Sequence, residues 1–513
     1  MVQRGKNKQL FINMLASLIT FAVGTGIGLL LTPYIVKQLG AEAYGFVGLS
    51  NMIISYAGLI TIALNGMAGR FVALSYTRGE VELANRYYSS VFYANVLLAF
   101  VITLAFLGCT IWLEYIIQIP DKLIWDVKVL FALLALTNVF SMMTGIYGTA
   151  CFIKNRLELS SIRTIVSQLI RAVVLIIAFG FFDAHVWYMG ISGALCALYV
   201  FVTNVYLARS LTPDLRIDRR MFDWAKIKEL VVSGVWNLIT KIGDLLANGI
   251  DLLFANLFIG PEAMGVFALT KNIPVMIQSL MSTTGGVFGP TMLQIYAKED
   301  TDALVREFKK SIRIMAMMSA IPLSLLYVFG EEFYWLWLPT QDSHWLYILT
   351  VAATCSMPLW QPLESLWQIF TLSNKVKYAS AAVLINNGLT FLIAFFAMIF
   401  VDSPTISLLI LAGTKNCLKF IMSITFLPIY AAKCIGTNHG EFYPTIIRYT
   451  FCFILICIIG FVIKHVVTIQ SWITLIVLGI ALSVISVFVN YVLMLTKSDR
   501  RFINNMINKF FRR

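Results

Sequence analysis

Residues 40–45 read Gly-Ala-Glu-Ala-Tyr-Gly, and residues 260–265, at an offset of 220, read Gly-Pro-Glu-Ala-Met-Gly. Further along the chain the same offset aligns a second group of similar side chains: Tyr76 with Tyr296, Arg78 with Lys298, Glu80 with Asp300, and Arg86 with Arg306. One short match arises easily by chance, but a second match in the same register does not. The sequence therefore predicts two copies of one structural unit.

Long apolar segments surround both copies of this motif. A helix that crosses a membrane needs about 20 apolar residues, and about 14 such segments lie near residues 9–36, 43–69, 87–113, 124–151, 160–182, 186–208, 228–259, 262–292, 310–330, 345–372, 377–400, 404–431, 446–467 and 471–496. The two motifs are six segments apart, and an even number keeps both copies in the same orientation. We therefore predict an all-α membrane protein with about 14 transmembrane helices: two six-helix lobes related by a parallel pseudo-twofold repeat, plus two C-terminal helices.

This arrangement predicts four parts of the chain. Residues 1–210 form the N-terminal six-helix lobe, and residues 211–228 form a basic cytoplasmic linker, in which Phe222 and Trp224 favour an interfacial helix. Residues 229–435 form the C-terminal six-helix lobe. Residues 436–513 contain the two additional helices and a basic amphipathic tail, whose apolar face includes Phe502.

The distribution of basic residues predicts the orientation in the membrane. Most of the 39 Lys and Arg lie at the termini and on alternate turns, so the positive-inside rule places the N- and C-termini in the cytoplasm. The formal net charge of +13 is thus a topology signal and not a sign of nucleic-acid binding. With 59% hydrophobic residues and no long polar insert, the chain has no room for a soluble catalytic domain.

Motifs for enzyme chemistry and for cofactors are missing from the sequence. Neither a GxxxxGK[ST] phosphate loop nor an HExxH zinc motif occurs, and the four histidines are scattered. The eight cysteines lie mostly in apolar segments without a CxxC pair, which indicates packing residues. We therefore predict a protein that is not an enzyme and that holds no metal and no cofactor.

Segment 228–259 carries a polar stripe. Its small and polar residues recur at intervals of three and four, which confines them to about one third of the helix circumference: Gly234, Asn237, Lys241, Asp244, Asn248 and Asp251. An ionisable residue near the bilayer centre costs at least about 2.5 kcal/mol, so it normally faces a cavity or a partner. A structural pair of Lys241 with Asp244 is the alternative, although Asp251 and the two asparagines extend the stripe beyond a single pair.

Charged residues also occur in other predicted helices: Arg171, Lys271, Glu364, Lys415 and Lys419. If they share one cavity with the stripe, cations exceed anions there, which suits an anionic ligand such as a phosphate or diphosphate. For Lys271 and Lys419 an equally good explanation is that each side chain extends its ammonium group toward the membrane interface. The carboxylates of Asp244, Asp251 and Glu364, with the neighbouring Asn237 and Asn248, are candidates for ion coupling, because a buried carboxylate can change its protonation.

Prolines lie beside these charged residues. Pro274 follows Lys271, while Pro358 and Pro362 precede Glu364. A proline removes a backbone donor and bends a helix. Bent helices are expected where a transporter moves between states.

The stretch from Asn13 to Arg86 resembles a known family. Its elements are a first helix that ends in Thr32-Pro33-Tyr34-Ile35-Val36, the turn Leu39-Gly40-Ala41-Glu42-Ala43-Tyr44-Gly45, and Arg78-Gly79-Glu80. They resemble the Wzx-type polysaccharide (O-antigen or capsule repeat-unit) flippases of the multidrug/oligosaccharidyl-lipid/polysaccharide exporter (MOP) superfamily.

The resemblance implies a V-shaped pair of lobes around a central cavity. It implies alternating access, in which an undecaprenyl-diphosphate-linked oligosaccharide moves from the inner to the outer leaflet of the bacterial cytoplasmic (inner) membrane. The family often couples transport to a proton or sodium gradient and uses cationic cavity residues, a role that Arg171, Lys241 and Lys271 match. It also implies a polysaccharide polymerase and chain-length machinery as partners.

Three other functions compete with this interpretation. A cation-coupled multidrug exporter of the same superfamily needs an acidic or apolar cavity, against which the excess of embedded Lys and Arg argues. A lipid II flippase typically has an arginine-rich first helix, where this chain has Thr20, Gly24 and Gly28. A membrane glycosyltransferase or polymerase usually presents a sizeable extramembrane loop, whereas the loops here are short.

Overall fold

The computed structural model describes residues 2–154, 156–248, 250–285, 288, 292, 295–296, 299–373, 375–496 and 499–500. Side chains of some helical residues in these ranges lie outside the description, among them those of Asn237, Lys241, Asp244 and Asn248. The described residues form helices joined by turns and loops, and they divide into two compact units, Met1–Ala268 and Leu269–Arg513. We call these the first unit and the second unit.

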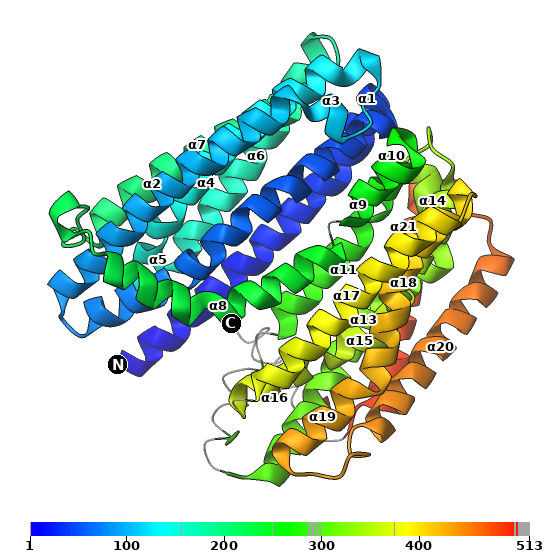
Figure 1. The fold of residues 1–513 in the computed structure, drawn as a ribbon. Helices are drawn as coiled ribbons and strands as arrows, with labels where there is room; N and C mark the ends of the chain where they lie inside the picture. The colour runs from blue at the N-terminus through cyan, green and yellow to red at the C-terminus, as the bar shows by residue number, and fades with distance from the viewer. Residues whose placement is uncertain are drawn as a thin grey trace. The chain divides into compact units, whose positions relative to one another are not determined.

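The first unit is a helical bundle in which α1 contacts α2, α4, α6 and α8, and α4 packs against α7 (Figure 1). Buried apolar side chains such as Leu31, Leu130 and Leu175 fill the space between these helices. Its elements are α1 (Val2–Thr77), α2 (Val81–Ile111), α3 (Leu113–Ile116), the 3-10 turn η1 (Asp121–Leu123), α4 (Ile124–Tyr147), α5 (Thr149–Ile153), α6 (Leu157–Phe181), α7 (Tyr188–Leu211), the 3-10 turn η2 (Arg219–Met221), α8 (Trp224–Asn248), α9 (Ile250–Phe254), the π-helical turn η3 (Ala255–Ile259) and most of α10 (Pro261–Thr270).

Helix α1 contains both of the first two predicted segments. The two parts meet at Gly40, whose φ of 81° and ψ of 165° lie outside the helical region. Gly260, its counterpart in the second copy, has φ 133° and ψ 170° between η3 and α10. Glycine tolerates this region of positive φ without the steric penalty that a Cβ brings. The repeated motif is therefore a repeated backbone conformation.

The two copies of the motif touch each other within the first unit. A Cβ built on Gly265 would lie 2.2 Å from the carbonyl oxygen of Ala41, and one built on Gly45 would lie 2.8 Å from the Cα of Gly265. One built on Gly48 would lie 3.4 Å from the Cβ of its own counterpart, Ala268. Contact between equivalent residues is the geometry of a twofold relation, in which each copy presents the same surface to the other.

The second unit is built around α13, which packs against α14, α15, α20 and α21 (Figure 1). Fully buried residues including Ile312, Leu323, Leu363 and Ile456 form its core. Its elements are the end of α10, α11 (Asn272–Gly285), α13 (Thr301–Trp337), α14 (Ser343–Thr354), α15 (Met357–Leu363), the 3-10 turn η5 (Glu364–Leu366), α16 (Trp367–Leu372), α17 (Val376–Phe400), α18 (Pro404–Ile424), α19 (Phe426–Ile435), α20 (Tyr443–Val466), α21 (Trp472–Val489) and the π-helical turn η6 (Asn490–Met494).

Ten of the described helical stretches are long and apolar enough to cross a membrane. Large apolar side chains on their outer faces, such as Phe100, Phe181 and Phe400, are exposed, as expected where hydrocarbon is the solvent. The prediction of an all-α, multi-pass membrane protein is therefore confirmed. The exact number of 14 transmembrane helices and the four predicted parts of the chain stay predictions.

The linker differs from the interfacial helix that the sequence favoured. Between Thr212 and Asp223 the backbone is mostly extended, and its one helical element is the short 3-10 turn η2. Polar side chains of α2 supply partners for this extended backbone, through bonds from Arg216 N to Asn85 Oδ1 (2.8 Å), Asp218 N to Ser89 Oγ (3.0 Å) and Asp223 N to Ser90 Oγ (2.8 Å). The expectation of a helix was wrong at Phe222, where these tertiary bonds satisfy the backbone without one, whereas Trp224 is the first residue of α8.

Candidate functional site

The predicted polar stripe lies on α8 and α9. Asn237, Lys241, Asp244 and Asn248 belong to α8, and their side chains lie outside the described residues. The described member of the stripe is Asp251, which is partly buried at the start of α9. Its Oδ1 accepts a hydrogen bond from the backbone N–H of Leu252 at 2.9 Å, and its charge lies within electrostatic reach of Tyr56 on α1.

Arg171 lies on α6 of the first unit and is partly buried. Its helix packs against α1 and α7. Lys271, in the second unit, is also partly buried and occupies the turn where α10 ends and α11 begins. Pro274 cannot donate a backbone hydrogen bond to Thr270, so the helix loses its continuity here. A cation thus lies at a break in a membrane helix.

Lys415 and Lys419 lie one turn apart on α18, inside the apolar stretch Pro404–Ile435. The Lys419 ammonium lies 3.1 Å from the centre of the Trp360 ring on α15. A contact between a cation and an aromatic face is worth about 0.5–2 kcal/mol, depending on its burial, so it favours one position of the charge within the span. Helix α15 packs against α18 and leads directly into Glu364, the first residue of η5. The structure therefore brings Lys415, Lys419 and Glu364 onto neighbouring elements of the second unit.

Asn416 positions the helix that carries these lysines. Its Nδ2 donates to the backbone carbonyl of Ala353 at 2.8 Å, and its Oδ1 accepts a hydrogen bond from Ser356 Oγ at 2.9 Å. Both partners lie at the break between α14 and α15. These hydrogen bonds hold α18 against the junction of α14 and α15. In a membrane such interhelical bonds matter because lipid cannot hydrogen-bond to the amide.

The sequence did not single out Gln361, which precedes Glu364 by three residues on α15. Its side chain is 0% exposed, and among the residues that the structure describes neither its Oε1 nor its Nε2 has a hydrogen-bond partner. A buried amide without a partner costs about 1–3 kcal/mol, and such groups often mark places that a ligand or water completes. The available signal was a glutamine between Pro358 and Pro362 in an apolar segment.

Arg163 is a second residue that sequence analysis missed. Its guanidinium donates from Nε to the backbone carbonyl of Leu159 at 2.9 Å, and it also contacts Asn204 Oδ1 on α7 and Cys151 Sγ on α5. These partners join three helices of the first unit. We interpret Arg163 as a structural cation, because each side of its guanidinium is engaged by the protein.

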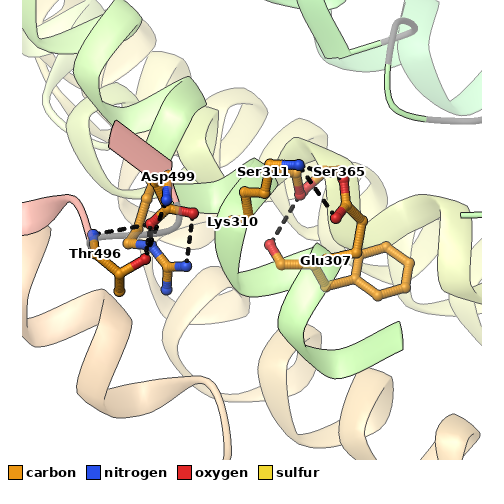
Figure 2. A network of polar contacts seen from close by, with 8 residues as sticks. Glu307, Lys310, Ser311, Ser365, Thr496 and Asp499 are labelled. Carbon is orange, nitrogen blue, oxygen red and sulfur yellow. Dashed lines mark hydrogen bonds and ion pairs between the residues drawn. The ribbon is translucent and has the colours of Figure 1, made fainter. Parts of the chain in front are cut away.

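Polar contacts connect α13 with η5 and with Thr496 and Asp499, which follow η6 (Figure 2). Ser311 Oγ donates to Ser365 Oγ at 2.9 Å, which holds the residue after Glu364 against α13. Nearby, Arg313 Nε lies 2.7 Å from the carboxylate of Asp499, which is 1% exposed and also accepts from Thr496 Oγ1 at 2.6 Å. Burial opposes the charged form of Asp499, but the hydrogen bonds from Arg313 and Thr496 outweigh burial and lower the pKa of this carboxyl.

Comparison with solved structures identifies the fold. The fold is similar to that of lipid II flippase MurJ in an inward closed conformation, with a TM-score of 0.65 and 10% identity over 93% of this chain and 98% of that one. It is also similar to an inward-facing multidrug resistance MATE family transporter of the MOP superfamily, with a TM-score of 0.61 and 16% identity over 83% of this chain and 97% of that one. The chain therefore has the fold that these two proteins share.

The sequence then gives the family. Residues 8–296 match the family described as polysaccharide biosynthesis protein, and because they make up more than half of the 513 residues, the chain belongs to that family. A relative of similar length is the uncharacterized membrane protein EpsK of Bacillus subtilis (strain 168), which is 27% identical over 503 residues, or 97% of this chain and 98% of EpsK. The resemblance to Wzx-type MOP flippases is thus confirmed at the level of family and fold.

Proposed function

We propose that the protein is a flippase that moves an undecaprenyl-diphosphate-linked oligosaccharide repeat unit from the inner to the outer leaflet of the bacterial cytoplasmic membrane. A sugar diphosphate cannot cross about 30 Å of hydrocarbon unaided, because its polar groups lose their hydration there. The observation that carries the proposal is the Lys419 ammonium held over Trp360 inside a membrane span. A cation held inside a membrane span can bind the diphosphate of such a substrate.

In this proposal the embedded cations bind the diphosphate. They are Arg171 and Lys241 in the first unit and Lys271, Lys415 and Lys419 in the second. Lysine and arginine form charge-assisted hydrogen bonds with phosphate oxygens, and these bonds are about twice as strong as neutral ones. The tail of the lipid stays in the membrane throughout. Both termini face the cytoplasm, in line with the positive-inside rule.

Coupling to an ion gradient is the second part of the proposal. Asp244, Asn237 and Asn248 on α8, Asp251 on α9 and Glu364 on η5 supply oxygen ligands or proton-binding groups. Glu364 begins the 3-10 turn between α15 and α16 and is followed by Ser365, which is bonded to α13. A carboxylate at such a helix break can change its protonation as its surroundings alternate during transport. A polysaccharide polymerase is the expected downstream partner.

The experiment is translocation in proteoliposomes with a fluorescent undecaprenyl-diphosphate oligosaccharide and an imposed proton or sodium gradient. Lys419→Gln and Lys241→Ala each remove an embedded cation and are expected to lower the rate at least tenfold. Lys433→Gln is the matched control, because Lys433 is an exposed lysine in the last turn of α19. Glu364→Gln is expected to remove the stimulation by the gradient.

Two results contradict the proposal. Unchanged translocation by well-folded Lys419→Gln and Lys241→Ala proteins would remove the cations from the mechanism. Transport of small organic cations without translocation of the lipid would move the assignment to a multidrug exporter and make the embedded cations structural.

A further inference from the structure

The first unit contains a groove of about 590 Å³ between α1, α2, the linker and the start of α8. Its volume falls in the range of about 300–1,000 Å³ that is typical of small-molecule sites. The walls are apolar and include Tyr93 and Leu97 of α2, Phe222 of the linker, and Val231 of α8. Arg219 contributes the charge among the described lining residues.

The linker side of the groove is held in place by the protein. Asn85, Ser89 and Ser90 of α2 bind the linker backbone, as described above. The Phe222 ring packs edge-on against Tyr93, with 6.2 Å between the ring centres. The groove is therefore formed before any ligand arrives, which reduces the entropy cost of binding.

The apolar walls of the groove are open to the surroundings. Leu97 is 58% exposed and Trp224 is 66% exposed. Leu97 is well inside the α2 span, whereas Trp224 begins α8 beside the charged linker, where an indole suits the boundary between headgroups and hydrocarbon. The groove thus extends from the interfacial zone toward the hydrocarbon, which is the path of a lipid acyl chain.

The charges of the linker favour an anion at the interfacial end. Its three acidic residues are engaged by donors of the first unit: Asp214 by the Tyr76 hydroxyl (3.2 Å), Asp218 by the backbone N–H of Arg220 (2.9 Å) and Asp223 by the backbone N–H of Ala225 (2.8 Å). Arg219 is exposed, and among the described residues no hydrogen bond or ion pair engages its guanidinium. An arginine at the headgroup level attracts anionic lipids.

We propose that this groove binds an anionic phospholipid of the surrounding membrane, with its headgroup phosphate on Arg219 and one acyl chain along Leu97 and Val231. A resident lipid would fill an apolar recess in which water has few polar partners. It would also tie the linker and the start of α8 to the membrane. This site is separate from the embedded cations, and it does not depend on which substrate is transported.

Photolabelling of the purified full-length protein in phosphatidylcholine nanodiscs tests the proposal. The probe is a phosphatidylglycerol with a diazirine on one acyl chain, added at a low mole fraction, and the labelled peptides are identified by mass spectrometry. We expect labelling of the α2 peptide that contains Leu97 and the α8 peptide that contains Val231. Arg219→Gln is expected to lower the apparent affinity about fivefold, the factor for about 1 kcal/mol per basic side chain near an anionic surface.

Arg220→Gln is the matched control, since it makes the same charge change at the neighbouring exposed residue, which does not line the groove. We expect it to leave the affinity within twofold of the parent. Leu97→Trp fills the groove and should abolish labelling of the α8 peptide, with folding checked by gel filtration and thermal unfolding.

Three results overturn the proposal. Equal losses of affinity in the two arginine variants would show a diffuse charge effect. Equal labelling by a phosphatidylcholine probe would show that the headgroup is not recognised. Displacement of the probe by undecaprenyl phosphate, but not by unlabelled phosphatidylglycerol, would identify a polyprenyl lipid as the occupant.

Discussion

After Gly40 the chain continues as helix from Ala41 to Thr77, whereas after Gly260 the corresponding helix stops at Thr270. The two starting points have similar backbone conformations and touch each other through Gly45 and Gly265. Beyond this contact the helices of the two copies differ in length. Pro274 follows the break in the second copy, where the first copy has Ile54.

The difference extends to the charged residues. Asp251 and Lys271 of the second copy correspond to Leu31 and Asn51 of the first. The second copy thus combines ionisable side chains with interrupted helices, while the first copy is uncharged and helical at the same positions. Because an ionisable group in a membrane is costly, we propose that the glycine contact is architectural and that the irregular helices of the second copy carry the function.

Of the variants considered, Gly265→Ala should disrupt the contact between the two copies most strongly. Its Cβ would lie 2.2 Å from the Ala41 carbonyl oxygen, so the two backbones must separate. We expect a loss of about 4 kcal/mol in the free energy of unfolding, at the upper end of what overpacking costs. Denaturant unfolding in detergent measures it. Gly24→Ala, with no atom within 4 Å of the new Cβ, is the control, and equal stability of the two variants would show that the contact is not tight.

Gly40→Ala and Gly260→Ala test whether the two turns are equivalent. Both glycines have positive φ with ψ near 170°, a region that costs a side chain about 1–3 kcal/mol. A Cβ on Gly40 would meet no atom within 4 Å, and one on Gly260 would meet only Gln118 Oε1 at 4.0 Å. We therefore expect similar losses of about 2 kcal/mol in both variants. A loss in only one copy would refute the equivalence.

Asn256→Val places the residue of the first copy, Val36, into the second. Asn256 exchanges two hydrogen bonds with the backbone of Gln118, at 2.9 Å and 3.0 Å. Valine leaves these backbone groups without a partner, which should cost about 1–2 kcal/mol. Gln118→Ala retains both bonds and removes only the one from Nε2 to Leu257, so its effect on unfolding should be smaller. The opposite order would assign the stabilisation to the Gln118 side chain.

Lys271→Asn gives the second copy the residue of the first at the helix break. If Lys271 binds the diphosphate, the variant should translocate the lipid about tenfold more slowly, equivalent to about 1.4 kcal/mol, at unchanged thermal stability. Lys271→Arg keeps the charge and should retain most of the rate. Normal transport by the asparagine variant would show that this charge does not serve the substrate.

The sequence predicted much of the fold and less of the site. Apolar segment lengths and the repeat at an offset of 220 indicated a helical membrane protein with two related copies, because these signals are local or periodic. The stacking of Lys419 on Trp360 depends on how α15 packs against other helices, and so does the burial of the Gln361 amide without a hydrogen-bond partner among the described residues. The extended linker likewise depends on Asn85, Ser89 and Ser90, which lie far from it in sequence. Periodicity along one helix carries no information about such partners.

The contact between Gly45 and Gly265 also has a consequence for biosynthesis. The face of α1 that carries Gly45 receives its partner only after the ribosome has made residues of the second repeat, so the first unit is completed only when synthesis has reached Ala268. A fragment cut at the end of the first repeat, near residue 210, would leave that face uncovered. A fragment that ends at Ala268 would include Gly265 and the neighbouring residues that pack on that face. When the protein is expressed as two separate fragments, we therefore expect them to assemble if the chain is divided after Ala268. We do not expect them to assemble if it is divided near residue 210.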